Sequence, residues 1–239
     1  MDDTSLMHLI LTCEHGGNQV PRAYRVCFTH AQQMLATHRG YDIGALSLAQ
    51  SLAHHFTAPL HSSKVTRLLI ELNRSLHHRS LFSEFTAGLA SETKRQIIDT
   101  FYLPYRTQVE TAIRETVGKK RQVLHVSVHT FTPQLNEQVR VADVGLLYSP
   151  QRTNENVFAK SWQTAIRDVF PNWTVRRNYP YRGSSDGFTT YLRTQFSPDL
   201  YLGLELEVNQ KHAANARFWR STVARGVAES LETALRRHS

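Results

Sequence analysis

The sequence of 239 residues is short of cysteine and contains no segment rich in proline, glycine or serine. Its two cysteines, Cys13 and Cys27, are too few for a disulfide framework and form no C-x-x-C pair, so we expect two reduced thiols. No linker, low-complexity tract or repeat period divides the chain. Because 41% of the residues are hydrophobic and the chain is long enough to bury a substantial core, we expect residues 1–239 to form one domain.

Long apolar runs are also absent. The first residues, MDDTSLMHLILTC, open with acids rather than with a basic segment, and their apolar stretch is too short and too interrupted for a signal peptide or a membrane span. We therefore expect a cytoplasmic protein that makes no contact with a membrane.

Acidic residues are outnumbered: 20 Asp and Glu stand against 28 Lys and Arg, which gives a net charge of +8. A basic protein can bind nucleic acid through its phosphates. Here the arginines are scattered along the chain, the dense basic runs are confined to residues 119–121 and 236–237, and no nucleic-acid-binding motif is present. We expect no nucleic-acid partner, since a solvated basic surface explains the charge better and would also suit an anionic substrate.

Two kinds of periodicity alternate along the chain. Residues 42–56 have an apolar stripe at helical spacing, with Asp42 in the N-cap position. Pro104 should kink or split the helix that is expected around it. Strands are predicted for residues 7–13, 67–73, 123–129, 144–148, 173–178 and 201–208. Further helices are predicted for residues 91–118, 153–169, 187–195 and 212–237.

Strands that alternate with helices predict an α/β domain of three layers, with a mixed, largely parallel central sheet flanked by helices. Sheets of this kind bind ligands beyond the carboxyl ends of their strands. The conspicuous polar residues end or follow predicted strands: His15, Asn73 with Arg74, His129, and Glu205 with Glu207. We therefore expect four separate segments to meet at one edge of the sheet.

Two of these residues are histidines at the ends of predicted strands. A lone histidine there is more often a buried or capping residue than a ligand, but two of them on neighbouring strands, with carboxylates available, favour a metal site. A zinc hydrolase needs about three protein ligands and a carboxylate beside the activated water. Glu205 and Glu207 point to one face of their strand, so either is a candidate for that carboxylate.

The segment IELNRSLHHRS places Asn73 and Arg74 directly after an apolar run. An arginine there can clamp a carboxylate through two parallel hydrogen bonds, and the neighbouring amide can add another. A structural salt bridge explains Arg74 equally well when it is taken alone. Further along, the turn-rich residues 178–188 offer Tyr181 and Arg182 in a loop that suits the cover of a pocket, or a plain connection.

Six segments together resemble a known family. CEHGGNQVP, HRGYDIGA, RLLIELNRS, SVHTFTP, NYPYRGSSDG and LELEVNQ occur in the order found in the N-formylglutamate amidohydrolase family, and they extend from the first predicted strand almost to the last helix. That family shares its fold and metal site with the zinc carboxypeptidases. The resemblance therefore implies a zinc-carboxypeptidase-like fold.

The resemblance also implies roles for individual residues. In the carboxypeptidases a first metal-binding histidine begins an H-x-x-E motif, a second lies in S-x-H-S/T after a strand, an N-R pair binds the substrate carboxylate, and a late glutamate is the general base. Carried onto this sequence, the metal ligands are His15 and His129, the clamp is Asn73 and Arg74 with Arg182 as a further contact, and the general base is Glu207, with Glu205 the lesser candidate.

The resemblance fails at one ligand. Asn18 stands where H-x-x-E has glutamate, and an uncharged amide is a poor zinc ligand. We assign Asp42, in HRGYDIGA, as the third ligand and Asn18 as a residue that orients water or substrate, with His38 ranked below Asp42. In LEVNQ, the residues after Glu207 also differ from the arginine and acid that are more frequent in the family, which bears on substrate identity.

The implied function is zinc-dependent hydrolysis of a small anionic N-acyl amino acid such as N-formylglutamate. One zinc ion is expected, with other divalent metals as alternatives, and Glu207 would be the base for a metal-activated water. Two other functions stay open: a non-catalytic binding protein on the same scaffold, motivated by Asn18, and a hydrolase that uses Cys13 with a histidine base. The acyl group, the amino acid and the oligomeric state also stay open.

Overall fold

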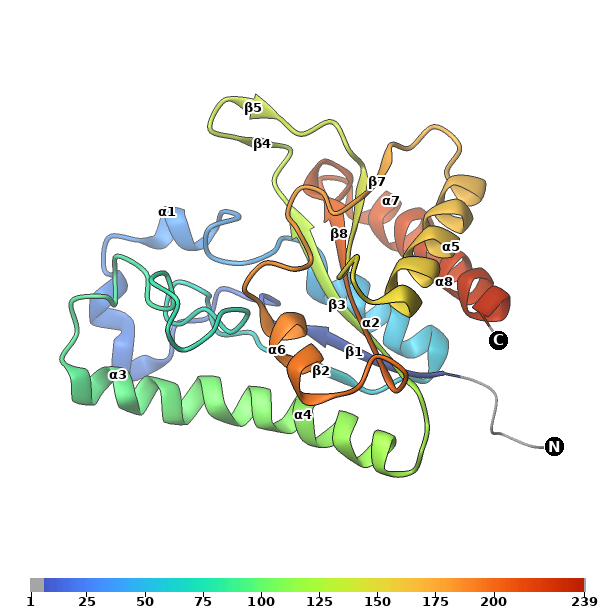
Figure 1. Cartoon of the computed structure of the whole chain (residues 1–239). Coiled ribbons are helices and arrows are strands. Elements are labelled where there is room, and N and C mark those ends of the chain that lie inside the picture. Colours follow the sequence, from blue (N-terminus) through green and yellow to red (C-terminus); the bar gives the residue numbers. More distant parts are fainter. Residues whose placement is uncertain (1–6, 239) are drawn as a thin grey trace.

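Six strands form the central sheet of the computed structural model, which describes residues 7–238 (Figure 1). Their order across the sheet is β2-β1-β3-β8-β6-β7; the first four run parallel to one another, while β6 and β7 run in the opposite direction. The predicted mixed, largely parallel sheet is confirmed. The strands are β1 (His8–Cys13), β2 (Leu60–Ser62), β3 (Val123–Phe131), β6 (Val144–Leu147), β7 (Val175–Arg177) and β8 (Tyr201–Asn209), and a separate hairpin comprises β4 (Gln134–Leu135) and β5 (Gln138–Val139).

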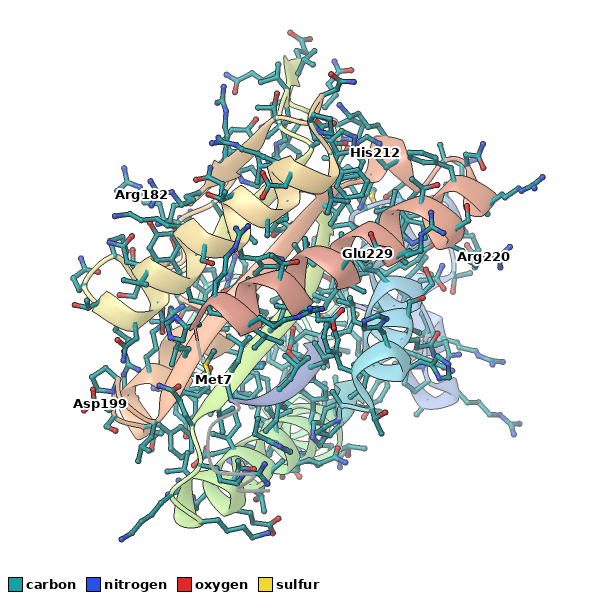
Figure 2. All side chains as sticks on the ribbon, turned by 90° about the vertical axis from the view of Figure 1, so that its right-hand side faces the viewer. Met7, Arg182, Asp199, His212, Arg220 and Glu229 are labelled. Carbon is teal, nitrogen blue, oxygen red and sulfur yellow. The ribbon has the colours of Figure 1, made fainter. Side chains whose placement is uncertain are left out.

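One face of the sheet is covered by three helices, α2 (Ala45–Phe56), α5 (Thr153–Val169) and α8 (Ala224–His238). Figure 2 looks onto this layer, in which α8 lies alongside α5 and carries Glu229 on its outward side. Every second residue of β1, β3 and β8 points into the layer and is fully buried, each leucine or valine stabilising the fold by about 1.5–3 kcal/mol. This apolar layer holds the strands in a fixed register.

The opposite face is covered by α4 (Leu103–Gly118) and α6 (Phe188–Gln195), together with irregular chain between β2 and α4. The helix predicted around Pro104 is split as expected: α3 (Ser91–Ile97) passes through a π-helical turn, residues 98–102, into α4. Pro104 follows this π-helical turn, where its missing N–H interrupts the regular hydrogen-bond pattern of the helix. The last predicted helix is divided in the same way, with α7 (Ala216–Phe218) and a π-helical turn before α8. The remaining short helices are α1 (Gln32–Leu35) and two 3-10 helices, Arg22–Phe28 and Gln210–His212.

The prediction of a strand at residues 67–73 is wrong. The segment makes turns, in which Glu71 N–H donates to Leu81 O at 2.9 Å, yet residues 68–70 are buried. An apolar run reports burial, and it does not distinguish a strand from a buried irregular segment. The strand that lies beside β1 at this edge is β2, which is three residues long and only partly buried, so it has no visible alternation.

The prediction that Asp42 caps a helix is also wrong. Helix α2 begins after Gly44, whose φ of 90° lies in the left-handed region, and this N-cap position makes no side-chain hydrogen bond. A Cβ on Gly44 would lie 3.0 Å from the Trp219 ring, so both the conformation and the space favour glycine. The turn leaves the Asp42 carboxylate free to point toward the edge of the sheet.

We expected neither a signal peptide nor a membrane span at the N-terminus. Residues 1–6 of that segment lie outside the described part of the chain. Between residues 7 and 238, none of the helices combines the length and the apolar character that crossing a bilayer requires.

His125 of β3 is a fully buried histidine on the face of the sheet covered by α4 and α6. Its Nε2 lies 2.9 Å from Thr12 Oγ1, and its Nδ1 lies 2.7 Å from the Tyr201 hydroxyl. Burial lowers the pKa of His125 from 6.5 to about 4, although Glu14 acts in the opposite direction. The ring is therefore held neutral in the folded protein.

This burial predicts a pH-dependent contribution of His125 to stability. As the pH falls below 6.5, the unfolded chain takes up a proton on His125 before the folded protein does, so stabilisation present above 6.5 is lost toward pH 4. The loss should reach about 3 kcal/mol. We expect the difference in unfolding free energy between wild type and His125→Gln, measured in urea at pH 7.5, 5.5 and 4.5, to shrink as the pH falls. A difference independent of pH would contradict the prediction, and the exposed His30→Gln variant is the control.

Candidate metal centre and active site

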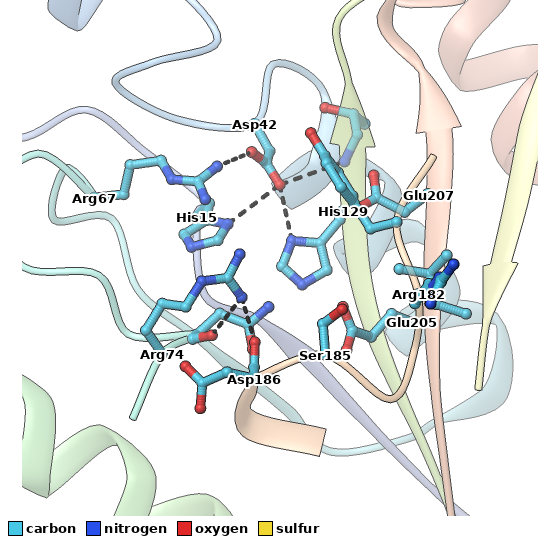
Figure 3. Close-up of a pocket in the computed structure, with 14 residues that line it drawn as sticks. His15, Asp42, Arg67, Arg74, His129, Arg182, Ser185, Asp186, Glu205 and Glu207 are labelled. Atoms are coloured by element: carbon cyan, nitrogen blue, oxygen red, sulfur yellow. Dashed lines mark hydrogen bonds and ion pairs between the residues drawn. The ribbon is translucent and has the colours of Figure 1, made fainter. Parts of the chain in front are cut away.

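The parallel register of β1, β3 and β8 brings polar residues together on one face of the sheet. Thr12 pairs with Ser127, Ser127 with Glu205, and His129 with Glu207. Because side chains alternate along a strand, all of these point away from the layer of α2, α5 and α8. The predicted meeting of separate segments is observed at the carboxyl ends of β1, β3 and β8 (Figure 3).

Three of the predicted residues form a tight, buried cluster. Asp42 Oδ2 lies 2.8 Å from His129 Nδ1 and 3.3 Å from His15 Nδ1. One donor atom from each of His15, Asp42 and His129 lies within 4.8 Å of the others. Tetrahedral zinc with bonds near 2.0–2.1 Å requires donor atoms about 3.3 Å apart, so this set is spaced for one ion.

Arg67 and Glu71 form hydrogen bonds with the side chains of this cluster. Arg67 Nη1 donates to Asp42 Oδ1 at 3.1 Å, and its Nε and Nη2 donate to Glu71 Oε2 at 2.8 and 2.6 Å. Glu71 Oε1 in turn accepts from His15 Nε2. Arg67 thus occupies the outer oxygen of Asp42, and Oδ2 faces the two histidines and the Thr130 N–H, which donates to it at 3.4 Å (Figure 3).

Glu14 lies behind the other histidine. Its Oε2 accepts from the Ser127 hydroxyl at 2.6 Å and lies 3.3 Å from His129 Nε2, and its Oε1 accepts from the Tyr105 hydroxyl at 2.8 Å. Burial alone would raise the pKa of Glu14, but hydrogen bonds from His129 and Ser127 outweigh it and hold the pKa well below the ordinary value. Glu14 is therefore a fully buried carboxylate anion.

The electrostatics of this cluster suit a divalent cation. Burial lowers the pKa of His129, yet hydrogen bonds to Asp42 and Glu14 overcome this and raise it well above 6.5. The pKa of His15 is also raised, by Glu71 and Asp42, against burial and the nearby Arg67. Glu14, Asp42 and Glu71 carry three charges against one on Arg67, so two negative charges are left when both histidines are neutral ligands. Two nitrogens, one carboxylate oxygen and this charge fit zinc.

Glu207 faces the cluster from β8. Its Oε2 is buried and has no hydrogen-bond partner among the described residues. Burial raises its pKa from 4.5 to about 8, and the nearby His129 offsets only part of the effect. Glu205, two residues earlier, also lines the pocket, but its Oε1 accepts from the Thr189 hydroxyl at 2.6 Å.

A pocket of about 190 Å³ opens beside this cluster. Asn73 and Arg74 line one side, and Arg182 lies on the loop between β7 and α6. The Oδ1 atom of Asn73 accepts from Phe188 N–H at 2.7 Å, which leaves Nδ2 for a ligand, and Arg74 Nη1 donates to Asp186 O at 2.5 Å. Within residues 7–238 neither arginine forms an ion pair, so neither is explained as a structural salt bridge.

Asn18 is the predicted site residue that the structure does not bring to the pocket. Its Nδ2 donates to Leu35 O at 3.0 Å, which ties the turn after β1 to α1. The placement does not support the expected contact with water or substrate. The glycines before it serve the same turn, since a Cβ on Gly16 would lie 2.8 Å from Ser63 O. His38 lies outside both the cluster and the pocket lining.

Cys13 lies on the other face of β1. Its side chain is fully buried in the apolar layer with α2, and burial raises the pKa of the thiol well above the ordinary value, with Glu14 adding to the effect. A buried thiol that resists ionisation is a poor nucleophile. Cys13 does not line the pocket, so the structure does not support a hydrolase that uses Cys13 as its nucleophile.

Sequence reasoning missed Glu14, Arg67 and Glu71. All three are charged residues in otherwise apolar runs, LTCEH and RLLIEL. A charge in such a run is seldom buried without a partner, so this pattern could have marked them as parts of a buried polar cluster.

Comparisons with known proteins concern the family and the fold of the chain. The chain matches the family model described as N-formylglutamate amidohydrolase over residues 7–213. A crystal structure of a gene product from Agrobacterium tumefaciens is 24% identical, with a TM-score of 0.84 over 99% of this chain and 94% of that chain. The crystal structure of N-formylglutamate amidohydrolase from Ralstonia eutropha is 17% identical, with a TM-score of 0.71 over 99% of this chain and 97% of that chain.

The two solved structures share the fold of this chain, and no curated protein sequence matches it significantly. The match to the family model covers most of the described residues and bears out the resemblance of the six sequence motifs. The chain belongs to the N-formylglutamate amidohydrolase family.

Proposed function

We propose that the protein is a zinc-dependent amidohydrolase that removes an acyl group, such as formyl, from a small anionic N-acyl amino acid. The observation that carries the proposal is the buried cluster of His15, Asp42 and His129, which lines the same pocket as Glu207 and Arg74. Membership in the amidohydrolase family supports the class of reaction.

His15 and His129 would hold the ion through Nδ1, and Asp42 would hold it through Oδ2. The chemistry that zinc supplies in such sites is polarisation of a carbonyl and activation of a water at neutral pH. Arg67 keeps Asp42 from rotating, because it binds the outer oxygen of that carboxylate.

Glu207 is the proposed general base. Its buried Oε2 has no competing donor among the described residues, and a desolvated carboxylate accepts a proton more readily than a solvated one. It would take the proton from the attacking water and pass it to the nitrogen of the leaving amine. Glu205 is the weaker candidate because Thr189 already donates to it.

Arg74, Asn73 and Arg182 are proposed to bind the carboxylates of the substrate. Arg74 is anchored by Nη1 to Asp186 O, and the rest of its planar group remains for a ligand. The Nδ2 atom of Asn73 is oriented by the bond that Oδ1 accepts from Phe188 N–H. A carboxylate held here would place the adjacent amide in the pocket that His129 and Glu207 line.

The metal assignment predicts the zinc content of the protein. Chain purified without a histidine tag should contain about one zinc ion per molecule by mass spectrometry. Asp42→Ala should lose the ion, because two histidines alone bind zinc weakly. His38→Ala should retain it, because His38 lies outside the cluster. Wild type without any bound divalent metal would contradict the proposal.

The base assignment predicts a loss of activity without a loss of metal. On a panel of N-formyl and N-acetyl amino acids, Glu207→Gln should release free amine about 10²–10⁴-fold more slowly than wild type while it keeps its zinc. Glu205→Gln is the matched control, since it makes the same change two residues away on the same face. A larger loss in Glu205→Gln would reverse the roles of the two residues. Wild type inactive on the whole panel would favour the non-catalytic binding protein.

The clamp assignment predicts a change in substrate binding. Arg74→Lys keeps the charge but loses the planar group, so we expect KM to rise about 10–100-fold with kcat nearly unchanged. Arg114→Lys, an exposed arginine on α4 that is paired with Glu110, should leave both constants unchanged. Unaltered KM in Arg74→Lys would place the substrate carboxylate elsewhere.

A further inference from the structure

Glu14 is a buried charge that the proposed reaction does not use. The side chain is 0% exposed and lies on the side of His129 away from Asp42. Among the described residues it has no arginine or lysine partner, and His129 is its sole ion-pair partner. Glu71, which lies behind His15, is by contrast neutralised by Arg67. A lone buried carboxylate is costly unless a positive charge lies close to it.

The hydrogen bonds around Glu14 determine where the His129 ring carries a proton. Both oxygens of Glu14 accept from hydroxyls, Oε1 from Tyr105 at 2.8 Å and Oε2 from Ser127 at 2.6 Å, so the single proton of the Ser127 hydroxyl points at Glu14. Ser127 Oγ lies 2.8 Å from His129 Nε2 and can then only accept from that nitrogen. Nε2 therefore carries a proton, and Nδ1, which faces Asp42 at 2.8 Å, is the nitrogen left for an ion.

We propose that Glu14 is a positioning residue for the metal centre: through Ser127 it holds the proton of His129 on Nε2, directs Nδ1 at the ion, and supplies a negative charge behind that ligand. This inference rests on the proposed function, because it assigns Glu14 through the ion held by His129. Tyr105 of α4 belongs to the same arrangement, since its hydroxyl donates to Glu14 Oε1 at 2.8 Å and does not contact His129. Carboxylates placed behind a metal-binding histidine orient the ring and raise its basicity.

Glu14→Gln is the main test, because it keeps the size of the side chain and removes the charge. Zinc affinity, measured by competition with a chromophoric chelator, should fall about 10–100-fold. His125→Gln is the matched control: it also changes a buried polar residue on the same face of β3, but its hydrogen bonds go to Thr12 and Tyr201, so zinc affinity should stay at the wild-type value. Equal affinities of wild type and Glu14→Gln would overturn the proposal.

A spectroscopic measurement tests the proton placement without reference to catalysis. Long-range proton–nitrogen NMR of the zinc-loaded wild type should show a proton on His129 Nε2 and a metal-bound Nδ1. Zinc bound through Nε2 would overturn the proposal. If Glu14→Gln does not fold, Tyr105→Phe decides, because its lost hydroxyl reaches the ion only through Glu14; a several-fold loss of zinc affinity supports the inference and no loss overturns it.

The two proposals fail in different ways. A wild-type protein that binds no divalent metal would refute the proposed function itself. A wild type that binds one zinc ion as tightly as Glu14→Gln does would refute the role of Glu14 alone.

Discussion

The carboxylate of Asp42 is the contact on which the arrangement of the site depends. Its Oδ2 is shared by His15 and His129, and its Oδ1 accepts from Arg67. These residues come from the turn after β1, from β3 and from the irregular chain after β2, which are far apart in the sequence. A buried carboxylate needs several donors to offset desolvation, so these partners are held in one geometry.

The excess of buried negative charge explains why the cluster favours a bound positive charge. The buried carboxylates outnumber the buried arginine in the cluster, and the surplus raises the pKa of both histidines. A proton on each histidine is one way to satisfy that surplus, and a divalent ion on both is another. The interior of the protein is thus already arranged for a positive charge beside the histidines, and Arg74 and Arg182 place further positive charge at the pocket.

Much of the fold follows from patterns that are local in the sequence. The strands β1, β3, β6, β7 and β8 and the helices α5 and α6 lie close to their predicted ranges, because period and turn residues report them directly. The prediction of a strand at residues 67–73 is wrong because a buried apolar run can form turns as well as a strand. The prediction that Asp42 caps α2 is wrong because the N-cap is the left-handed Gly44, two residues later, so the Asp42 carboxylate is not used as a cap. Both differences lie beside the cluster of His15, Asp42 and His129, where the chain departs from regular structure.

The sequence by itself determined the family, the alternation of strands with helices, and the segments that supply His15, His129, Arg74 and Glu207, because motifs and periodicity are local properties. Only the tertiary structure decided which further carboxylates surround the histidines, since Glu14 and Glu71 reach them through strand register and turns that no local pattern encodes. It also separated neighbours in one motif: Cys13 points into the apolar layer, while Glu14 and His15 lie at the cluster with Asp42 and His129. Alternation along β1 places Glu14 opposite Cys13, and the turn that begins at Glu14 brings His15 to the same side.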